Sequence, residues 1–328
     1  MRFSTHKRSI APWLAGAIAI AGITTVVAWA DQPPKGGLRH ARLYEVVSSK
    51  VLHNVNRTDA QAALTVWAEL MGKQKGFLLD TKVDIVDTVG ELIARLNSRS
   101  VDVLAVCVTE FLELESLHLV IPVFTSGRGA RGESHFSYVV VVKSSSTATG
   151  IAGLWGKNVL VFSRTLENAG IAWLDVLLGK ERLGRTSSFF ASMKVTDKSQ
   201  GCILPVFFGT VDACVVDEVN LDLAKELNPQ LGQLKVLVRS RPIIETVIAT
   251  PVWSLPYENE WKESMLSAQQ SPQGRQIMMV FKADRAVPIQ PADLDAAREL
   301  WGDYFRLPGS IPNQTPTAPG VGGPLSTR

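Results

Sequence analysis

Short apolar runs rich in β-branched residues alternate along this chain with stretches in which apolar residues recur at helical spacing. Residues 41–48 and 101–108 are strand-like runs, and the apolar residues of 60–71 between them repeat every three or four positions up to a glycine that we expect to end the helix. The run 101–108 is continuously apolar, which is typical of a strand buried on both faces. Repeated strand–helix–strand units predict parallel sheets with right-handed crossovers, and therefore an α/β fold.

A second strand–helix series begins at residue 138. It contains strand-like runs at 138–143 and 158–162 and a helix pattern at 169–178. A further strand-like run at 243–249 and a helix pattern at 292–304 follow near the end. No Pro- or Gly-rich linker separates the two series, so we expect two closely coupled lobes rather than two independent domains.

The first 30 residues have the layout of a secretory signal peptide. Three basic residues come first, an almost uncharged run follows at 10–28, and Ala28-Trp29-Ala30 forms a small-x-small cleavage site. We predict that residues 1–30 are removed and that the mature chain is exported to a periplasm. The alternative is a retained membrane anchor, because the apolar run is close to the length of a membrane span.

The charge balance of the mature chain argues against nucleic-acid binding. The 328 residues include 34 Lys and Arg and 31 Asp and Glu, which gives a net charge of +3. Removing Arg2, Lys7 and Arg8 with the signal peptide leaves 31 basic and 31 acidic residues. A protein that neutralises phosphates needs a basic surface, which a neutral chain does not predict.

Both flanks of the expected lobes lack apolar periodicity. Residues 31–40 are predicted to be a flexible leader, and the Pro- and Gly-rich residues 307–328 a disordered tail. Between them we expect lobe 1 to comprise 41–138 and 244–306, and lobe 2 to comprise 139–243.

No metal or cofactor site is predicted. The histidines are scattered, and Cys107, Cys202 and Cys214 do not have zinc-ligand spacing. An odd number of cysteines leaves at least one free, and Cys202 could pair with Cys214 in a disulfide. Residues 127–132 spell G-x-G-x-x-G, but a strand pattern rather than a helix follows, so a solvated turn is favoured over a dinucleotide site.

Polar side chains gather in loops where a predicted strand ends and a helix begins. In parallel sheets such loops lie at the carboxyl ends of strands, where ligands bind, and helix N-termini there attract oxyanions. The same residue types are good helix caps, which is the alternative for each loop. The candidate ligand-binding residues are Ser48, Asn54, Asn56, Thr109, Ser163, Arg164, Thr165, Asn168, Lys198, Ser199 and Asp217.

Two of these loops carry a specific expectation. Ser163 and Thr165 should lie at the N-terminus of the helix 169–178 and donate to ligand oxygens, with Thr109 facing them from the other lobe. The carboxylate of Asp217 either accepts a ligand amine or hydroxyl, or caps the helix that starts near residue 220.

Short motifs at 101–105, 138–143, 154–159 and 209–213 occur in an order that resembles the substrate-binding proteins of phosphate, phosphite and phosphonate ABC transporters. The resemblance implies a type II periplasmic binding protein, with two mostly parallel sheets flanked by helices and two crossover strands, expected at 138–143 and 243–249. The family's Ser-Thr-Ser-Gly loop is matched only in part by Ser163 and Thr165, and Lys198 or Arg164 could supply charge in its place.

The resemblance implies a transport receptor rather than an enzyme. It would be a monomer that binds a small oxyanion or zwitterion, such as phosphonate, phosphite or phosphate, and docks on a membrane permease. One alternative is a periplasmic sensor subunit of the same fold that signals to a membrane kinase or cyclase. An enzyme on a related fold is disfavoured by the scattered histidines and the lack of a nucleophile motif.

Overall fold

The computed structural model describes residues 37–52, 55–128, 132–253, 255–310 and 316. The predicted signal peptide therefore lies outside the described residues, as does most of the predicted leader. The first strand begins at Arg39, so the last two residues of that predicted leader, Arg39 and His40, belong to the sheet.

Lobe 1 is built on a six-stranded sheet with the order β11-β4-β10-β3-β1-β2. Strand β1, next to the edge strand β2, pairs in parallel with both β2 and β3, whereas β10 is antiparallel to β3 and β4. The strands are β1 (Arg39–Ser48), β2 (Phe77–Val86), β3 (Val103–Cys107), β4 (Val120–Gly127), β10 (Thr246–Pro251) and β11 (Arg285–Pro288).

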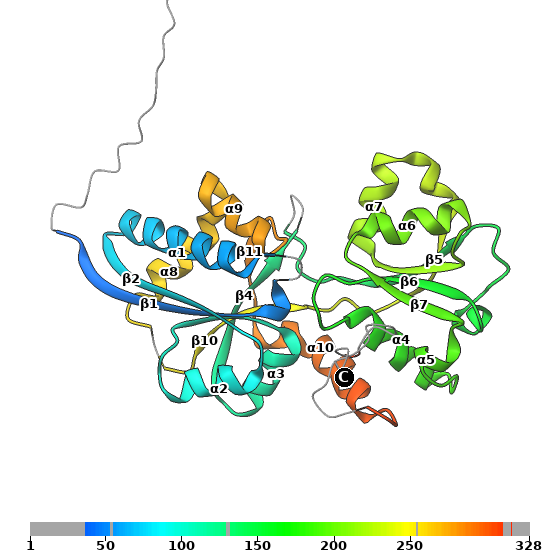
Figure 1. Cartoon of the computed structure of the whole chain (residues 1–328), viewed down its shortest axis with the longest axis horizontal. Helices are drawn as coiled ribbons and strands as arrows, with labels where there is room; N and C mark the ends of the chain where they lie inside the picture. Colours follow the sequence, from blue (N-terminus) through cyan, green and yellow to red (C-terminus); the bar gives the residue numbers. More distant parts are fainter. Residues whose placement is uncertain (1–36, 53–54, 129–131, 254, 311–315, 317–328) are drawn as a thin grey trace, which may run out of the picture. The chain divides into compact units, whose positions relative to one another are not determined.

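Helices cover both faces of this sheet. Figure 1 shows α1 (Arg57–Gln74), α8 (Glu258–Ser267) and α9 (Pro272–Val280) on one face and α2 (Val89–Asn97) and α3 (Val108–Ser116) on the other. Gly72, the expected helix end, lies inside α1. A Cβ atom there would be 2.6 Å from Cγ of Leu79 on β2, so this glycine permits close helix–strand packing instead of ending the helix.

Lobe 2 contains the second sheet, with the order β7-β6-β8-β5-β9. In Figure 1, α4 and α5 lie on one face of this sheet and α6 and α7 on the other. The strands are β5 (Tyr138–Lys143), β6 (Asn158–Phe162), β7 (Ser192–Thr196), β8 (Ala213–Asp217) and β9 (Leu234–Arg239). The helices are α4 (Ala169–Lys180), α5 (Thr186–Phe189), α6 (Ser199–Phe208) and α7 (Glu218–Leu227). Short 3₁₀ helices occur in both lobes. They are η1 (Ser49–Val51), η2 (Ile151–Leu154), η3 (Pro229–Gln233), η4 (Ala268–Gln270) and η5 (Pro291–Leu294).

Most strands of each sheet run in one direction, as expected: β1 to β4 share a direction in lobe 1, and β6 to β9 share one in lobe 2. β10 is inserted between β3 and β4, and β5 between β8 and β9, and both run antiparallel to their neighbours. The two expected crossover strands are thus members of the sheets. The chain passes between the sheets in the segments just before β5 and β10, where Phe136 and Ile243 form an antiparallel bridge with N···O distances of 2.8 and 3.1 Å.

The described part of the predicted disordered tail is bonded to the folded body. It follows α10 (Asp295–Arg306), which packs against α3 and α4. The hydroxyl of Ser310 donates to the carbonyl of Tyr304 at 2.8 Å and accepts from Arg185 at 3.0 Å. The side-chain amide of Asn168 donates to the carbonyl of Pro316 at 2.9 Å. These hydrogen bonds correct the expectation of disorder at residues 307–310 and 316.

The three cysteines are free thiols in the buried interior. The thiol of Cys202 donates to the carbonyl oxygens of Val215 and Leu160 at 3.3 and 3.4 Å, and no disulfide joins it to Cys214. Within the described ranges, no helix combines the length and hydropathy needed to cross a membrane. The same ranges hold no cluster of His, Cys, Asp and Glu suited to a metal ion.

Candidate functional site

Arg164 and Glu245 form a buried ion pair where the chain crosses between the sheets. Arg164 lies in the loop after β6, and its guanidinium carbon is 3.6 Å from the ring centroid of Phe136. Its Nε is 3.7 Å from a carboxylate oxygen of Glu245, and both side chains are less than a tenth exposed. The Nη1 of Arg164 is buried and has no hydrogen-bond partner among the described residues. Arg164 therefore retains an unused N–H donor.

Glu245 is held by a second partner on β5. The hydroxyl of Tyr138 donates a hydrogen bond to its carboxylate. Burial raises the pKa of Glu245, and the nearby charge of Arg164 and the hydrogen bond from Tyr138 partly offset that effect. The buried carboxylate of Glu245 is thus held in one orientation by Arg164 and Tyr138.

Arg128 is the second arginine of this region, and its side chain is half-buried. Its Nε lacks a partner in the described part of the chain. Burial, followed by the like charge of Arg164, lowers the pKa of Arg128 to about 10, whereas Asp217, Asp284 and Glu245 raise it. Arg128, Arg164, Asp217 and Glu245 therefore lie within electrostatic range of one another, and we call these four residues the arginine site.

Arg128, near the start of the glycine-rich stretch 127–132, is half-buried, and residues 129–131 lie outside the described residues. Arg128 and Glu133 pair as an antiparallel bridge, with N···O distances of 2.8 and 2.7 Å, and the chain continues into β5 without a helix. The dinucleotide interpretation is thus excluded here. Gly132 has a φ of 70°, and a Cβ atom there would be 2.9 Å from Cδ of Arg285, so the turn needs glycine.

Thr109 meets lobe 2 through Glu167 and not through Ser163 or Thr165. The backbone N–H of Thr109 donates to the Glu167 carboxyl at 3.2 Å, and its hydroxyl donates to the same oxygen. Burial raises the pKa of Glu167 to about 8. The N-terminus of α3, where an oxyanion was expected, thus holds a carboxyl group of the chain itself.

A second carboxyl group, that of Glu110, anchors the neighbouring loop. It accepts from the hydroxyl of Ser48 at 3.0 Å and lies 3.2 Å from Nζ of Lys50. The carbonyl of Lys50 in turn accepts from the N–H of Leu166 at 3.2 Å, which adds a further hydrogen bond between the lobes.

The hydroxyls of Ser163 and Thr165 make hydrogen bonds within their own loop. Ser163 donates to the carbonyl of Thr165 at 2.6 Å, and the Thr165 hydroxyl accepts from the N–H of Glu167 at 3.4 Å. Helix α4 starts only at Ala169, so neither residue lies at its N-terminus as expected. Asn168 takes the N-cap position with a φ of 53°, but its side chain makes no capping bond.

The remaining predicted residues mostly cap helices. Ser48 caps η1, the exposed Asn56 caps α1, and Asp217 caps α7 through Asn220. Lys198 is the exposed residue before α6, and Ser199 is the first residue of that helix. Asn54 lies outside the described residues.

Of the four residues of the arginine site, Arg164 and Asp217 were predicted from the sequence, whereas Arg128 and Glu245 were not, and neither was Tyr138. One signal could have indicated Glu245, since it is a charged residue inside the otherwise apolar run 243–249. Two arginines within a short glycine-rich turn were the corresponding signal for Arg128.

Residues 50–294 match the model of a family described as the periplasmic substrate-binding protein of phosphonate ABC transporters. The chain belongs to this family. Its members are substrate-binding components of a transporter rather than enzymes, which implies a small-molecule ligand and a membrane permease as partners. A search of curated protein sequences gives no match.

Solved structures show the same fold at low sequence identity. XAC2383 from Xanthomonas citri, bound to chloride, has a TM-score of 0.55 and 14% identity over 81% of this chain and 98% of that one. A second structure of it, bound to ATP, has a TM-score of 0.54 and 14% identity over 81% and 97%. A binding protein component of an ABC phosphonate transporter from Pseudomonas aeruginosa has a TM-score of 0.50 and 13% identity over 81% and 87%. This chain therefore shares the architecture of type II periplasmic binding proteins.

Proposed function

We propose that this phosphonate-transport binding protein holds the oxyanion of its ligand on Arg128 and Arg164. The observation that carries this proposal is the pair of buried N–H donors, Nε of Arg128 and Nη1 of Arg164, which have no partner among the described residues. Two guanidinium groups of like charge lie close enough for one to lower the pKa of the other. A ligand anion would relieve both the repulsion and the missing hydrogen bonds.

The carboxylates of the arginine site narrow the ligand class. Asp217 and Glu245 offset the two positive charges, so a small ligand with one oxyanion group and few other charges suits the site. Phosphonate, phosphite and phosphate have that chemistry, and an amine on a zwitterionic ligand would find Asp217 and Glu245 as acceptors. Arg164 is stacked on Phe136 and ion-paired with Glu245, which pre-organises its guanidinium for planar oxyanion recognition.

The candidate ligand-binding residues named from the sequence have different roles in this proposal. Arg164 and Asp217 belong to the arginine site. Thr109, Ser163, Thr165 and Asn168 would support it by fixing the loop after β6. Ser48 and Asn56 are structural in this proposal because their side chains cap helices, and Lys198 and Ser199 are assigned no role because they only mark the start of α6.

The export pathway follows from the N-terminal 30 residues. We infer that cleavage after Ala30 releases a periplasmic monomer that delivers its ligand to a membrane permease. Intact-mass analysis of a periplasmic fraction should give a chain that starts at Asp31, and a membrane-bound full-length chain would contradict cleavage.

Isothermal titration calorimetry with methylphosphonate, phosphite, phosphate and sulfate tests the site. Arg164→Ala and Arg128→Ala should each weaken the best of these ligands by about tenfold to a hundredfold, as expected for a lost hydrogen bond between charged groups. Arg164→Lys keeps the charge but loses the planar fork, and should recover only part of the affinity. Lys194→Ala, which removes an exposed cation of β7, is the control. Unchanged affinity in both folded arginine variants would refute the proposed site.

A further inference from the structure

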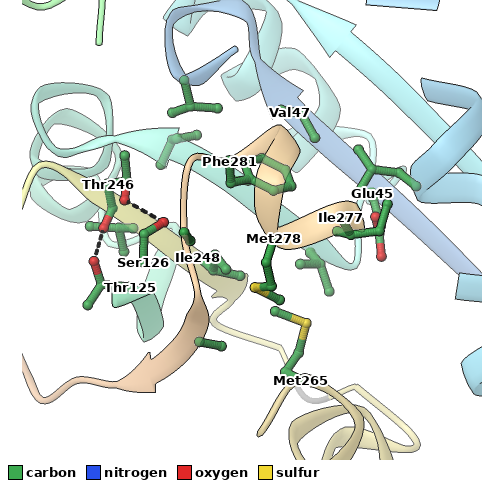
Figure 2. A pocket seen from close by; sticks show the side chains of 18 of the residues that line it. Glu45, Val47, Thr125, Ser126, Thr246, Ile248, Met265, Ile277, Met278 and Phe281 are labelled. Atoms are coloured by element: carbon green, nitrogen blue, oxygen red, sulfur yellow. Dashed lines mark hydrogen bonds between the residues drawn. The ribbon is translucent and has the colours of Figure 1, made fainter. Parts of the chain in front are cut away.

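A cavity of about 50 Å³ lies inside lobe 1, between the sheet and helices α1, α8 and α9. None of the four residues of the arginine site lines it. Its wall is largely apolar and includes Trp67, Trp261, Met265, Met278 and Phe281. Figure 2 shows Met265 and Met278 at its centre, with their sulfur atoms toward each other. We call this space the lobe-1 cavity.

One carboxyl group lines the lobe-1 cavity. Glu45 lies on β1, is only 6% exposed and stands beside Ile277 at one end of the cavity in Figure 2. Within the described part of the chain no hydrogen bond or ion pair reaches its carboxyl group. Burial alone raises the pKa of Glu45 to about 7. An unpaired buried carboxyl group is costly, so this position calls for a partner that donates hydrogen bonds or carries positive charge.

Three donors in the same wall also lack partners, and one of them is the buried Nε of Arg285. The indole N–H groups of Trp67 and Trp261 are buried, line the lobe-1 cavity and have no acceptor among the described residues. Buried polar groups are nearly always satisfied in folded proteins, by protein atoms or by something bound between them. The cavity thus presents one unmatched acceptor and three unmatched donors, the two indole N–H groups and Nε of Arg285, on an apolar background.

We propose that the lobe-1 cavity binds a short amino alcohol, with its ammonium group on the carboxylate of Glu45 and its hydroxyl oxygen accepting from an indole N–H. The methylene groups would contact the thioethers of Met265 and Met278, and the faces of the tryptophan rings attract a cation. A cavity of about 50 Å³ has room for about three or four water-sized groups, which is the size of ethanolamine.

Ethanolamine binding to the full chain, measured by calorimetry at pH 8, tests this proposal. Glu45→Gln should weaken binding by tenfold or more, and its fold should persist because the variant removes a buried charge. Trp261→Phe, which removes the N–H but keeps an aromatic ring, should weaken binding several-fold. Glu226→Gln on the exposed side of α7 is the matched control and should bind as the parent does.

Analogues separate the two contacts. Ethylammonium lacks the acceptor oxygen and propan-1-ol lacks the charge, so both should bind more weakly than ethanolamine. Affinity should be roughly tenfold higher at pH 8 than at pH 6, because the ionised fraction of Glu45 rises through its pKa of about 7. Arg285 is the other charged group of the cavity wall, and Lys75, Tyr257 and Glu260 line an adjoining cavity.

Three results would overturn the proposal. Absence of ethanolamine binding at millimolar concentration would mean that the lobe-1 cavity holds only water. Equal affinity in the parent and in Glu45→Gln would remove Glu45 from any site. Loss of ethanolamine binding in Asp217→Asn would place the amine at the arginine site. Methylphosphonate affinity should be unchanged in Glu45→Gln, so the two proposals stand or fall separately.

Discussion

The carboxyl group of Glu167 accepts hydrogen bonds from both the backbone N–H and the hydroxyl of Thr109, although the two residues belong to different lobes. Thr109 lies in the first turn of α3, where backbone N–H groups have no partner within the helix. Lobe 2 thus supplies the N-terminal partner of a lobe-1 helix. The pairing links the two lobes at the place where the sequence predicted contact with a ligand.

The first prediction concerns the pH dependence of this link. The pKa of Glu167 in the folded chain is about 8, above its ordinary value of 4.5, so the native state binds the proton more tightly than the unfolded chain does. The stability from this group is complete below about pH 4.5 and declines as the pH rises through 8. Thermal unfolding from pH 5 to 9 should show a smaller decline for Glu167→Gln. Glu45, Glu245 and Asp102, whose pKa values are also raised by burial, contribute to the remaining decline. An identical pH profile for parent and variant would contradict the assignment.

The second prediction concerns the hydroxyl of Thr109. Thr109→Val removes one of the two donors to Glu167 and should destabilise the fold by about 1–3 kcal/mol, because a buried acceptor then loses a partner. Thr109→Ser keeps the hydroxyl and should cost less. A double-mutant cycle with Glu167→Gln, measured by denaturant unfolding, gives the coupling energy, and a coupling of zero would show that the two groups do not interact in solution.

The third prediction concerns the C-terminal segment. A chain that ends at Leu307 loses the hydrogen bonds of Ser310 to Arg185 and Tyr304, whereas a chain that ends at Ser310 keeps them. At about 1 kcal/mol for each bond, the shorter chain should melt a few degrees lower than the longer one. Calorimetric melting of both chains measures the difference, and equal melting temperatures would mean that Ser310 adds nothing to stability.

The fourth prediction compares two helical glycines. Gly72→Ala places a methyl group 2.6 Å from the side chain of Leu79 and should cost about 1–3 kcal/mol through overpacking. Gly302→Ala in α10 meets no atom within 4 Å and should stabilise the fold by about 0.5–1 kcal/mol through helix propensity. Urea unfolding of both variants should therefore give shifts of opposite sign.

Local patterns of apolar residues in the sequence predicted much of the fold. The apolar spacing of 60–71 corresponds to the buried face of α1, because burial of one helix face requires that spacing. The apolar residues of 169–178 form α4, which is buried on nearly all sides. Strand direction has no comparable signature, so the antiparallel insertion of β10 and β5 could not be read from their apolar runs. Gly72 was misread for a similar reason, since its neighbour on β2 is not adjacent in sequence.

The site residues that escaped prediction depend on distant partners. Nothing near Glu167 indicates that its carboxyl group meets Thr109, 58 positions earlier. Arg128 sits in a turn whose composition is typical of a solvated loop, and its burial results from packing between segments far apart in the chain. Ser163 and Thr165 were placed on the correct loop, but the loop runs three residues further before α4 begins, which moves their hydroxyls away from the helix end.

The place of β10 in the lobe-1 sheet has a consequence for synthesis of the chain. The lobe-2 sheet is made from one continuous stretch, 138–239, whereas β3 and β4 of lobe 1 are joined only through β10, which begins at Thr246. A chain emerging from the ribosome can therefore complete the lobe-2 sheet while the facing edges of β3 and β4 still lack their neighbour. Unpaired strand edges invite association with other chains. The lobe that is synthesised first is thus the one that needs protection longest.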